Sequence, residues 1–255
     1  MGRFLGTPMN NHISPAIIMR IKEFGESDLL VEYFTPDKGR LKGVAKGARK
    51  SRVRFVNCLD LFCLANLEYE QKGRNDLHFL YSGKLINAFP GIRSDFFSLS
   101  LASYMVELTE ILFPPAVVAG EVFALMKNAF SALNDKDRID VLRLHFEARA
   151  MTLGGYGIDF KKCCSCQREY TGKGRAVFRA TMGSIACLAC EPETQRSPGL
   201  APETVEVLKI MQSRPWTDVR DLPLTGEIIS EIRPVLRLHI EHQLGRRLKT
   251  SEYLE

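Results

Sequence analysis

The chain has 255 residues, of which 45% are hydrophobic and 25% are charged, so it is long and apolar enough to form one to three folded domains. Its longest apolar runs fall far short of the roughly 20 residues of a membrane helix, and residues 1–14 lack the apolar stretch of a signal peptide, so we expect a cytoplasmic protein with no membrane contact. The net charge of +5 is concentrated early, because residues 1–90 hold 14 Lys and Arg against 9 Asp and Glu, whereas the other residues hold 21 of each.

Residues 13–87 are predicted to form a small β domain. Branched side chains and alternating polarity mark five strands, with turn clusters at 25–28, 35–39 and 71–76, and the strands are expected at residues 16–24, 29–35, 39–49, 59–71 and 77–87. Five strands joined mostly by short turns favour an antiparallel barrel or sandwich. Aromatic residues in this part are available for base stacking, but we expect most of them in the core.

From about residue 91 the apolar period becomes helical. Helices are predicted over residues 95–113, 117–133 and 137–157, with buried stripes that begin at Phe97 in the first and Val118 in the second. Pro202 is expected to open a further helix, and Thr225 is expected to cap a last one that ends at Gly245. Pro234 should kink that last helix or mark its real start. His145 and His239 are expected to be structural residues on these helices.

Five of the seven cysteines lie between residues 163 and 190. Cys163 and Cys166 are spaced C-x2-C, and so are Cys187 and Cys190, which is the arrangement of two thiolate pairs that converge on one tetrahedral metal ion. We predict a structural zinc site with four protein ligands and no open coordination position. Cys164 is expected to be a spectator. An iron–sulfur cluster and a redox dithiol pair stay open as alternatives. Cys58 and Cys63 lie in apolar surroundings and are expected in the core.

The segment KGRLKGVAKGARKSRVR, residues 38–54, holds eight basic residues and no acidic residue. Such a segment is either a solvated basic face or a surface for a polyanion. Its lack of acidic residues and its place in a β domain favour phosphate binding with little sequence preference. No phosphate-loop, zinc-protease or nucleophile-elbow motif occurs in the chain, so we expect a binding protein and not an enzyme.

Three stretches carry a resemblance to a known family. AIIMRIKEFGESDLLVEYFTPDKGRLKGVAKGARKSRVRF, LRLHFEARAMTLGGYGIDFKKCCSCQ and RPVLRLHIEHQLGRRLKTSEYL, in this order, resemble the bacterial RecO family of recombination mediators from about residue 14 to 253. The resemblance implies an α+β multidomain fold: an N-terminal OB-fold barrel (9–88), an all-α domain (89–158 and 198–255) and an inserted zinc-ribbon-like motif with four cysteine ligands (159–197). Some members lack the four cysteines, and many have glycine where Gln167 follows Cys166 here.

The function implied by the resemblance is DNA repair by homologous recombination. Members bind single- and double-stranded DNA, anneal complementary strands and act with RecR to load RecA on strands coated with single-strand-binding protein, in the bacterial cytoplasm at the nucleoid. The DNA contacts implied here are Arg20, Lys42, Lys46, Arg49, Lys50, Arg52 and Arg54. Cations for the acidic tail of single-strand-binding protein are expected among Arg138, Arg143, Arg237, Arg246 and Arg247.

Two other functions stay open on the sequence alone. One is a zinc-ribbon and barrel protein that binds RNA or the ribosome. The other is a zinc or thiol enzyme in which Cys164 is the nucleophile. The sequence does not indicate which surface meets RecR or whether the chain self-associates.

Overall fold

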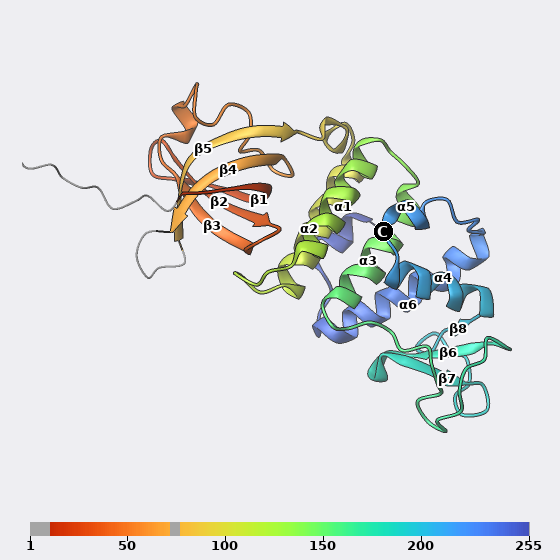
Figure 1. Ribbon diagram of the computed structural model, residues 1–255. Helices are drawn as coiled ribbons and strands as arrows, with labels where there is room; N and C mark the ends of the chain where they lie inside the picture. Colours follow the sequence, from red (N-terminus) through yellow and green to blue (C-terminus); the bar gives the residue numbers. More distant parts are fainter. Residues whose placement is uncertain (1–10, 72–76, 255) are drawn as a thin grey trace, which may run out of the picture. The chain divides into compact units, whose positions relative to one another are not determined.

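The computed structural model describes residues 11–71 and 77–254 (Figure 1). Two compact units form: one contains the chain up to residue 90 together with residues 113–130, and the other contains residues 91–112 and 131–255. None of the described helices combines the length and the apolar character needed to cross a membrane. The boundaries expected for the four domain segments stay predictions.

The first unit is built on a closed five-stranded barrel of β1 (His12–Phe24), β2 (Asp28–Thr35), β3 (Gly39–Ala45), β4 (Leu64–Gln71) and β5 (Leu77–Asn87) (Figure 1). The strand order around the barrel is β1-β2-β3-β5-β4, and every pair is antiparallel except β3 with β5. This is an OB-like barrel, which confirms the predicted fold class.

Two predicted strands are shorter than expected. The strand expected over residues 39–49 ends at Ala45, because Gly47 takes a left-handed conformation and the 3-10 helix η1 (Ala48–Lys50) follows. The strand expected over residues 59–71 begins at Leu64, because the residues before it form turns and Phe62 takes a positive φ of 67°. The predicted turn at 71–76 lies almost wholly outside the described residues.

The barrel interior holds the branched and aromatic side chains that point inward from alternate strand positions. Ile18, Val31 and Leu67 are fully buried, and the predicted core positions of Tyr33 and Tyr69 are confirmed by exposures of 0% and 1%. Each such side chain contributes about 1.5–3 kcal/mol of hydrophobic stabilisation. Cys58 and Cys63 are buried in the same core, as expected.

Residues 113–130 pack on the barrel and belong to its unit. Gly39 has a φ of 68° and lies so close to the Val117 carbonyl that a Cβ would meet its oxygen at 1.9 Å, so only glycine fits there. Helix α2 (Gly120–Asn134) contributes Phe130, whose ring contacts that of Phe62 edge-on at 5.6 Å. Val118 is 67% exposed, contrary to the predicted stripe, because it precedes the first helical residue.

The second unit is mostly helical, with α1 (Phe96–Leu112), α3 (Ile139–Leu153), α4 (Pro202–Ser213), α5 (Trp216–Val219) and α6 (Gly226–Leu244). The 3-10 helix η2 (Pro90–Arg93) lies at its start and η4 (Lys249–Leu254) near its end. The Thr225 side chain accepts a hydrogen bond from the backbone N–H of Ile228 at 3.3 Å, and Gly245 ends α6 in a left-handed conformation, so both predicted ends are confirmed. Pro234 lies inside α6 and does not mark its start.

A three-stranded antiparallel sheet follows α3 in the chain. It consists of β6 (Ala176–Arg179), β7 (Ser184–Cys187) and β8 (Gly199–Leu200), in the order β7-β6-β8, with the 3-10 helix η3 (Ala180–Met182) between the first two strands. Arg175 forms ion pairs with Glu193 at 2.6 Å and with Glu231 of α6 at 2.9 Å. Glu231 also accepts the backbone N–H of Ala201 at 2.8 Å, so this sheet is fixed on the helices.

Candidate nucleic-acid interface, metal centre and helical groove

A row of charged side chains crosses three strands of the barrel. Arg20 of β1 lies in register with Glu32 of β2, and Glu32 lies in register with Lys42 of β3. The Lys42 ammonium is 3.2 Å from the Glu32 carboxylate, and Arg40 approaches the same carboxylate at 3.8 Å. The row is therefore a cation-rich surface in which one carboxylate already neutralises part of the charge.

The basic loop, residues 46–54, is anchored at both ends. The backbone N–H of Gly47 donates to the Asp28 carboxylate at 2.8 Å, which ties the start of the loop to β2. At the other end the Arg54 guanidinium donates to the Lys46 carbonyl at 2.7 Å, and the Arg54 carbonyl accepts from the Gly83 N–H of β5 at 2.8 Å. The loop is thus an ordered projection from the barrel, with Lys50 and Arg52 exposed along it.

The predicted DNA-contacting residues differ in whether their cationic groups are already paired within the protein. Arg49 pairs with Glu23 at 3.1 Å, and Arg54 closes the loop through its hydrogen bond to a backbone carbonyl. Within the described part of the chain, Lys46, Lys50 and Arg52 are exposed and have no carboxylate partner. These three are the cations best placed to neutralise phosphates, because no internal ion pair has to break.

The five aromatic residues that the sequence offered for base stacking are mostly buried. Tyr33, Phe34, Phe55 and Tyr69 are each at most 5% exposed. Tyr81 donates its hydroxyl to Glu70 at 2.5 Å. These five residues therefore form no exposed stacking surface, whereas Phe24 at the end of β1 is 52% exposed. The exposed cations of the basic loop suit contact with a phosphate backbone.

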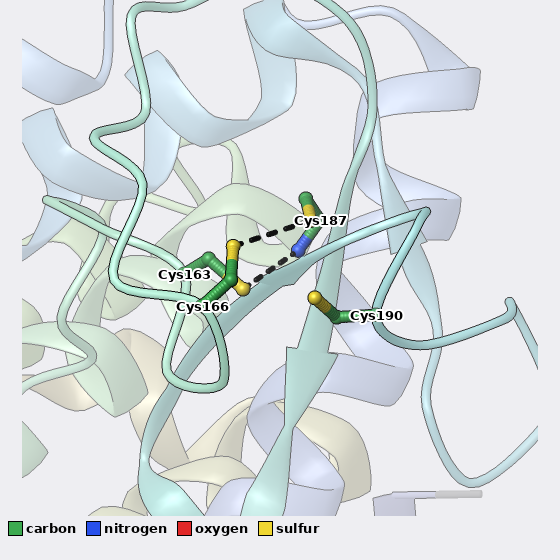
Figure 2. Close-up of side chains that lie close together, drawn as sticks. All are labelled: Cys163, Cys166, Cys187 and Cys190. Atoms are coloured by element: carbon green, nitrogen blue, oxygen red, sulfur yellow. Dashed lines mark hydrogen bonds between the residues drawn. The ribbon is translucent and has the colours of Figure 1, made fainter.

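The two cysteine pairs converge, as Figure 2 shows. The sulfur atoms of Cys163, Cys166, Cys187 and Cys190 all lie within 4.8 Å of one another, and those of Cys166 and Cys187 are 3.9 Å apart. Four sulfurs at about 2.3 Å from a central Zn²⁺ lie about 3.8 Å from one another in a tetrahedron. The cluster therefore fits a single four-coordinate ion, and the sulfurs are too far apart for disulfide bonds.

Backbone N–H groups already stabilise a thiolate in this cluster. Burial alone would raise the pKa of Cys163, but N–H groups of Cys166, Cys187 and Ser165 directed at its sulfur outweigh burial and lower the pKa to about 6. The Cys187 N–H lies 3.3 Å from the Cys163 sulfur (Figure 2). Close approach of the Cys187 and Cys166 sulfurs raises the pKa of Cys190 to about 12, a cost that a bound cation would remove.

The residues next to the cluster have separate roles. Cys164 is not among the four convergent sulfurs; its N–H donates to the Ile185 carbonyl at 2.8 Å and its side chain is partly exposed. Gln167 takes a φ of 60°, and its N–H donates to the Cys163 carbonyl at 3.0 Å. This left-handed position closes the first pair, and it is a conformation that glycine adopts at less cost than glutamine.

The second unit contains a groove of about 560 Å³, here called the helical groove. It is lined from α1 by Phe97 and Tyr104, from α3 by Leu144, from α6 by Ile240, and from the segment after α6 by Leu248 and Leu254 among others. Phe97 is 44% exposed, contrary to its predicted burial, because it faces this groove. The size falls within the range of ligand-binding clefts.

Charged side chains of both signs line the helical groove. Arg143 pairs with the buried Glu147 carboxylate at 2.9 Å, and its guanidinium lies 5.2 Å from the centre of the Tyr104 ring. Arg233 and Arg237 lie one turn apart on α6, are exposed, and have no ion pair within residues 11–71 and 77–254. With Arg143 and Arg247 they make four arginines in the lining, against the three carboxylates of Asp140, Glu147 and Glu241, so the groove has one excess positive charge.

The five arginines predicted for an acidic tail are not all at the groove. Arg143, Arg237 and Arg247 line it, and Arg247 pairs with Glu241 at 3.0 Å. Arg138 does not line it; its guanidinium donates to the Arg220 and Leu222 carbonyls at 2.7 and 2.8 Å. Arg246 does not line it either, and it is exposed.

Arg233 lines the groove and was missed by sequence reasoning. The signal was present, because Arg233 and Arg237 are four residues apart and therefore share one face of a helix. Pro234 obscured it, because a proline at this position allowed the helix to begin after Arg233.

Comparisons with known proteins cover almost the whole chain. The family model described as "Recombination protein O N terminal" matches residues 9–89, and "Recombination protein O C terminal" matches residues 93–252. A "DNA repair protein RecO" of Syntrophus aciditrophicus is 30% identical over 247 residues, which are 96% of this chain and 95% of that protein. A protein of the same description from Anaeromyxobacter sp. (strain K) is 29% identical over 239 residues, 94% of either chain.

Proposed function

The chain belongs to the RecO family of DNA repair proteins, and from this premise we propose that it is a mediator of homologous recombination that anneals complementary strands. It binds single- and double-stranded DNA through the barrel and acts on strands coated with single-strand-binding protein. With RecR it loads RecA onto those strands. The work is charge neutralisation and strand alignment, without covalent chemistry, in the cytoplasm at the nucleoid.

The observation that carries the DNA-binding proposal is the basic loop on the OB-like barrel. Lys46, Lys50 and Arg52 project from an anchored loop and are free of internal ion pairs within the described residues. Arg20 and Lys42 extend the positive surface onto the strands, and Arg49 and Arg54 add charge while they hold the loop. Such a surface contacts phosphates, so binding is strong at low salt and nearly independent of sequence.

The helical groove supports the proposed contact with the tail of single-strand-binding protein. An acidic and hydrophobic tail needs an apolar cleft with cations at its edge, and the groove combines Phe97 and Ile240 with Arg233 and Arg237. The Glu147 carboxylate at its base is paired with Arg143 and with the Tyr104 hydroxyl at 2.8 Å, so it repels an acidic ligand less than a free carboxylate would. Arg247 adds a fourth cation. Arg138 and Arg246 are left out of this proposal.

The cysteine cluster is proposed to hold structural zinc. Cys163, Cys166, Cys187 and Cys190 supply four sulfur ligands, so no position is left for a catalytic water. The sheet that follows is fixed to the helices through Arg175. The ion would order the insert, and DNA binding would remain a property of the barrel.

The experiment that tests the proposal is strand annealing with the purified chain. Two complementary oligonucleotides carrying a fluorescent donor and acceptor are mixed at low salt, and the rate of pairing is measured with and without protein. The proposal expects a rate increase that disappears when Lys46, Lys50 and Arg52 are changed to alanine together. An unchanged pairing rate at low salt, with DNA bound, would refute annealing.

A further inference from the structure

One wall of the helical groove is formed by a segment outside the helix bundle. Residues 248–254, here called the strap, contain η4 and place Leu248, Ser251 and Leu254 along the groove. Leu248 is 3% exposed, whereas the following residues are more accessible. The groove therefore exists in this form only while the strap lies against the helices.

A single carboxylate holds the start of the strap. Glu107 of α1 accepts hydrogen bonds from the backbone N–H of Lys249 at 3.0 Å, from the N–H of Thr250 at 2.9 Å and from the Thr250 hydroxyl at 2.6 Å. Glu107 is only 8% exposed and does not itself line the groove. Three bonds to one charged acceptor form a latch between segments more than 140 residues apart in sequence.

The latch is charged at neutral pH. Burial would raise the pKa of Glu107, but hydrogen bonds from Thr250 and Lys249 and the nearby positive charge of Arg246 outweigh burial and hold the pKa below its ordinary value. Hydrogen bonds to a carboxylate are stronger than those between neutral groups.

The other end of the strap is held more weakly. Arg143 donates to the Leu254 carbonyl at 3.4 Å, which is a long hydrogen bond. Tyr253 contacts the ring of Phe96 edge-on at 6.0 Å, and both rings are more than half exposed. Loss of the Glu107 latch should therefore release most of the strap.

We propose that Glu107 is a positioning residue for ligand binding: by latching the strap to α1 it builds one wall of the helical groove and sets the affinity of the groove for an acidic, hydrophobic peptide tail. The inference rests on the proposed binding of such a tail. A ligand that needs the complete groove binds only the latched fraction of molecules, so its apparent Kd rises in proportion as that fraction falls.

The test uses the full chain and a short fluorescent peptide from the carboxyl-terminal tail of single-strand-binding protein. Glu107→Ala is expected to weaken peptide binding about tenfold. Glu252→Gln is the matched control, because Glu252 is an exposed carboxylate within the strap and makes no hydrogen bond among the described residues. It should bind the peptide at least as tightly as wild type, and both variants should bind DNA as wild type does.

Two further readouts separate positioning from a general loss of structure. Hydrogen exchange at the Lys249 and Thr250 amides should accelerate in Glu107→Ala and slow again with saturating peptide, because the peptide selects the latched state. In a chain shortened to end at Arg247, Glu107→Ala should cause no further loss of affinity.

The outcomes are distinct. If the wild-type chain binds the peptide and Glu107→Ala binds it with the same affinity, the inference is overturned and the proposed function stands. A further loss of affinity in the shortened chain would also overturn it, because Glu107 would then act without the strap. If the shortened chain does not fold, hydrogen exchange in Glu107→Ala is the deciding measurement. Exchange at the Lys249 and Thr250 amides that saturating peptide does not slow would contradict the inference. A wild-type chain that does not bind the peptide would overturn the proposed tail contact and this inference with it.

Discussion

Removal of the three unpaired cations of the basic loop should change how DNA binding depends on salt. Each phosphate of single-stranded DNA that the protein no longer neutralises lowers the slope of log K against log salt by about 0.7, so Lys46, Lys50 and Arg52 together account for a slope change of about 2. The ratio of the wild-type binding constant to that of the triple alanine variant should therefore fall about 20-fold between 50 and 200 mM salt. The fold should tolerate the change, because the described structure gives these side chains one ring contact, from Lys46 to Phe79 at 5.5 Å, and no ion pair.

The assay is fluorescence anisotropy with a labelled single strand at several salt concentrations. The control variant changes Lys84, Lys127 and Lys173 to alanine, which removes the same net charge from exposed positions outside the loop. Its slope should match that of wild type. An unchanged slope in the loop variant, or an equal loss in the control, would refute the assignment of phosphate contacts to the loop.

Three other predictions follow from the second unit. Burial lowers the pKa of His145 to about 4, below about 6.5 in the unfolded chain, so the unfolded state binds more protons and stability is lost as pH falls from 6.5 toward 4. His145 should lower the free energy of unfolding by about 2 kcal/mol at pH 5. Urea unfolding at pH 7.5 and at pH 5 should therefore show a smaller loss of stability for His145→Gln than for wild type, and an identical loss would contradict this. Metal analysis should find one zinc per chain, and Cys187→Ser should remove the zinc while DNA binding persists. Loss of DNA binding together with loss of the zinc would show that zinc does more than order the insert. Gln167→Gly should stabilise the metal-bound chain by up to about 1 kcal/mol, because Gln167 has a φ of 60°, whereas Ser165→Gly should destabilise it; the opposite order in thermal unfolding would contradict the strained turn.

The sequence predicted those features that depend on residues close together in the chain. Alternating polarity identified the strands of the barrel, and the C-x2-C spacing identified the four convergent cysteines, because both signals arise between residues a few positions apart. The cap at Thr225 and the end at Gly245 were readable for the same reason. Strand ends were less predictable. Gly47 ends β3 in a left-handed turn, but the sequence does not distinguish it from Gly39 and Gly43 of the same segment.

The groove could not be read from the sequence. Its walls come from α1, α3, α6 and the strap, and no local period reports that these segments meet. Arg138 illustrates the difficulty: it looks like a free surface cation in sequence, yet its guanidinium holds two carbonyls more than 80 residues away. Helix α5, with Trp216, was missed because four residues are too few to show a helical period.

Annealing of strands coated with single-strand-binding protein tests the central proposal most directly. The purified chain is added to complementary strands covered either by intact single-strand-binding protein or by the same protein lacking its acidic tail, and pairing is followed by energy transfer. We expect rapid pairing on strands coated with the intact protein, and slower pairing both when the coating protein lacks its tail and when the loop variant replaces the wild-type chain. No acceleration of pairing on strands coated with the intact protein would contradict the proposal.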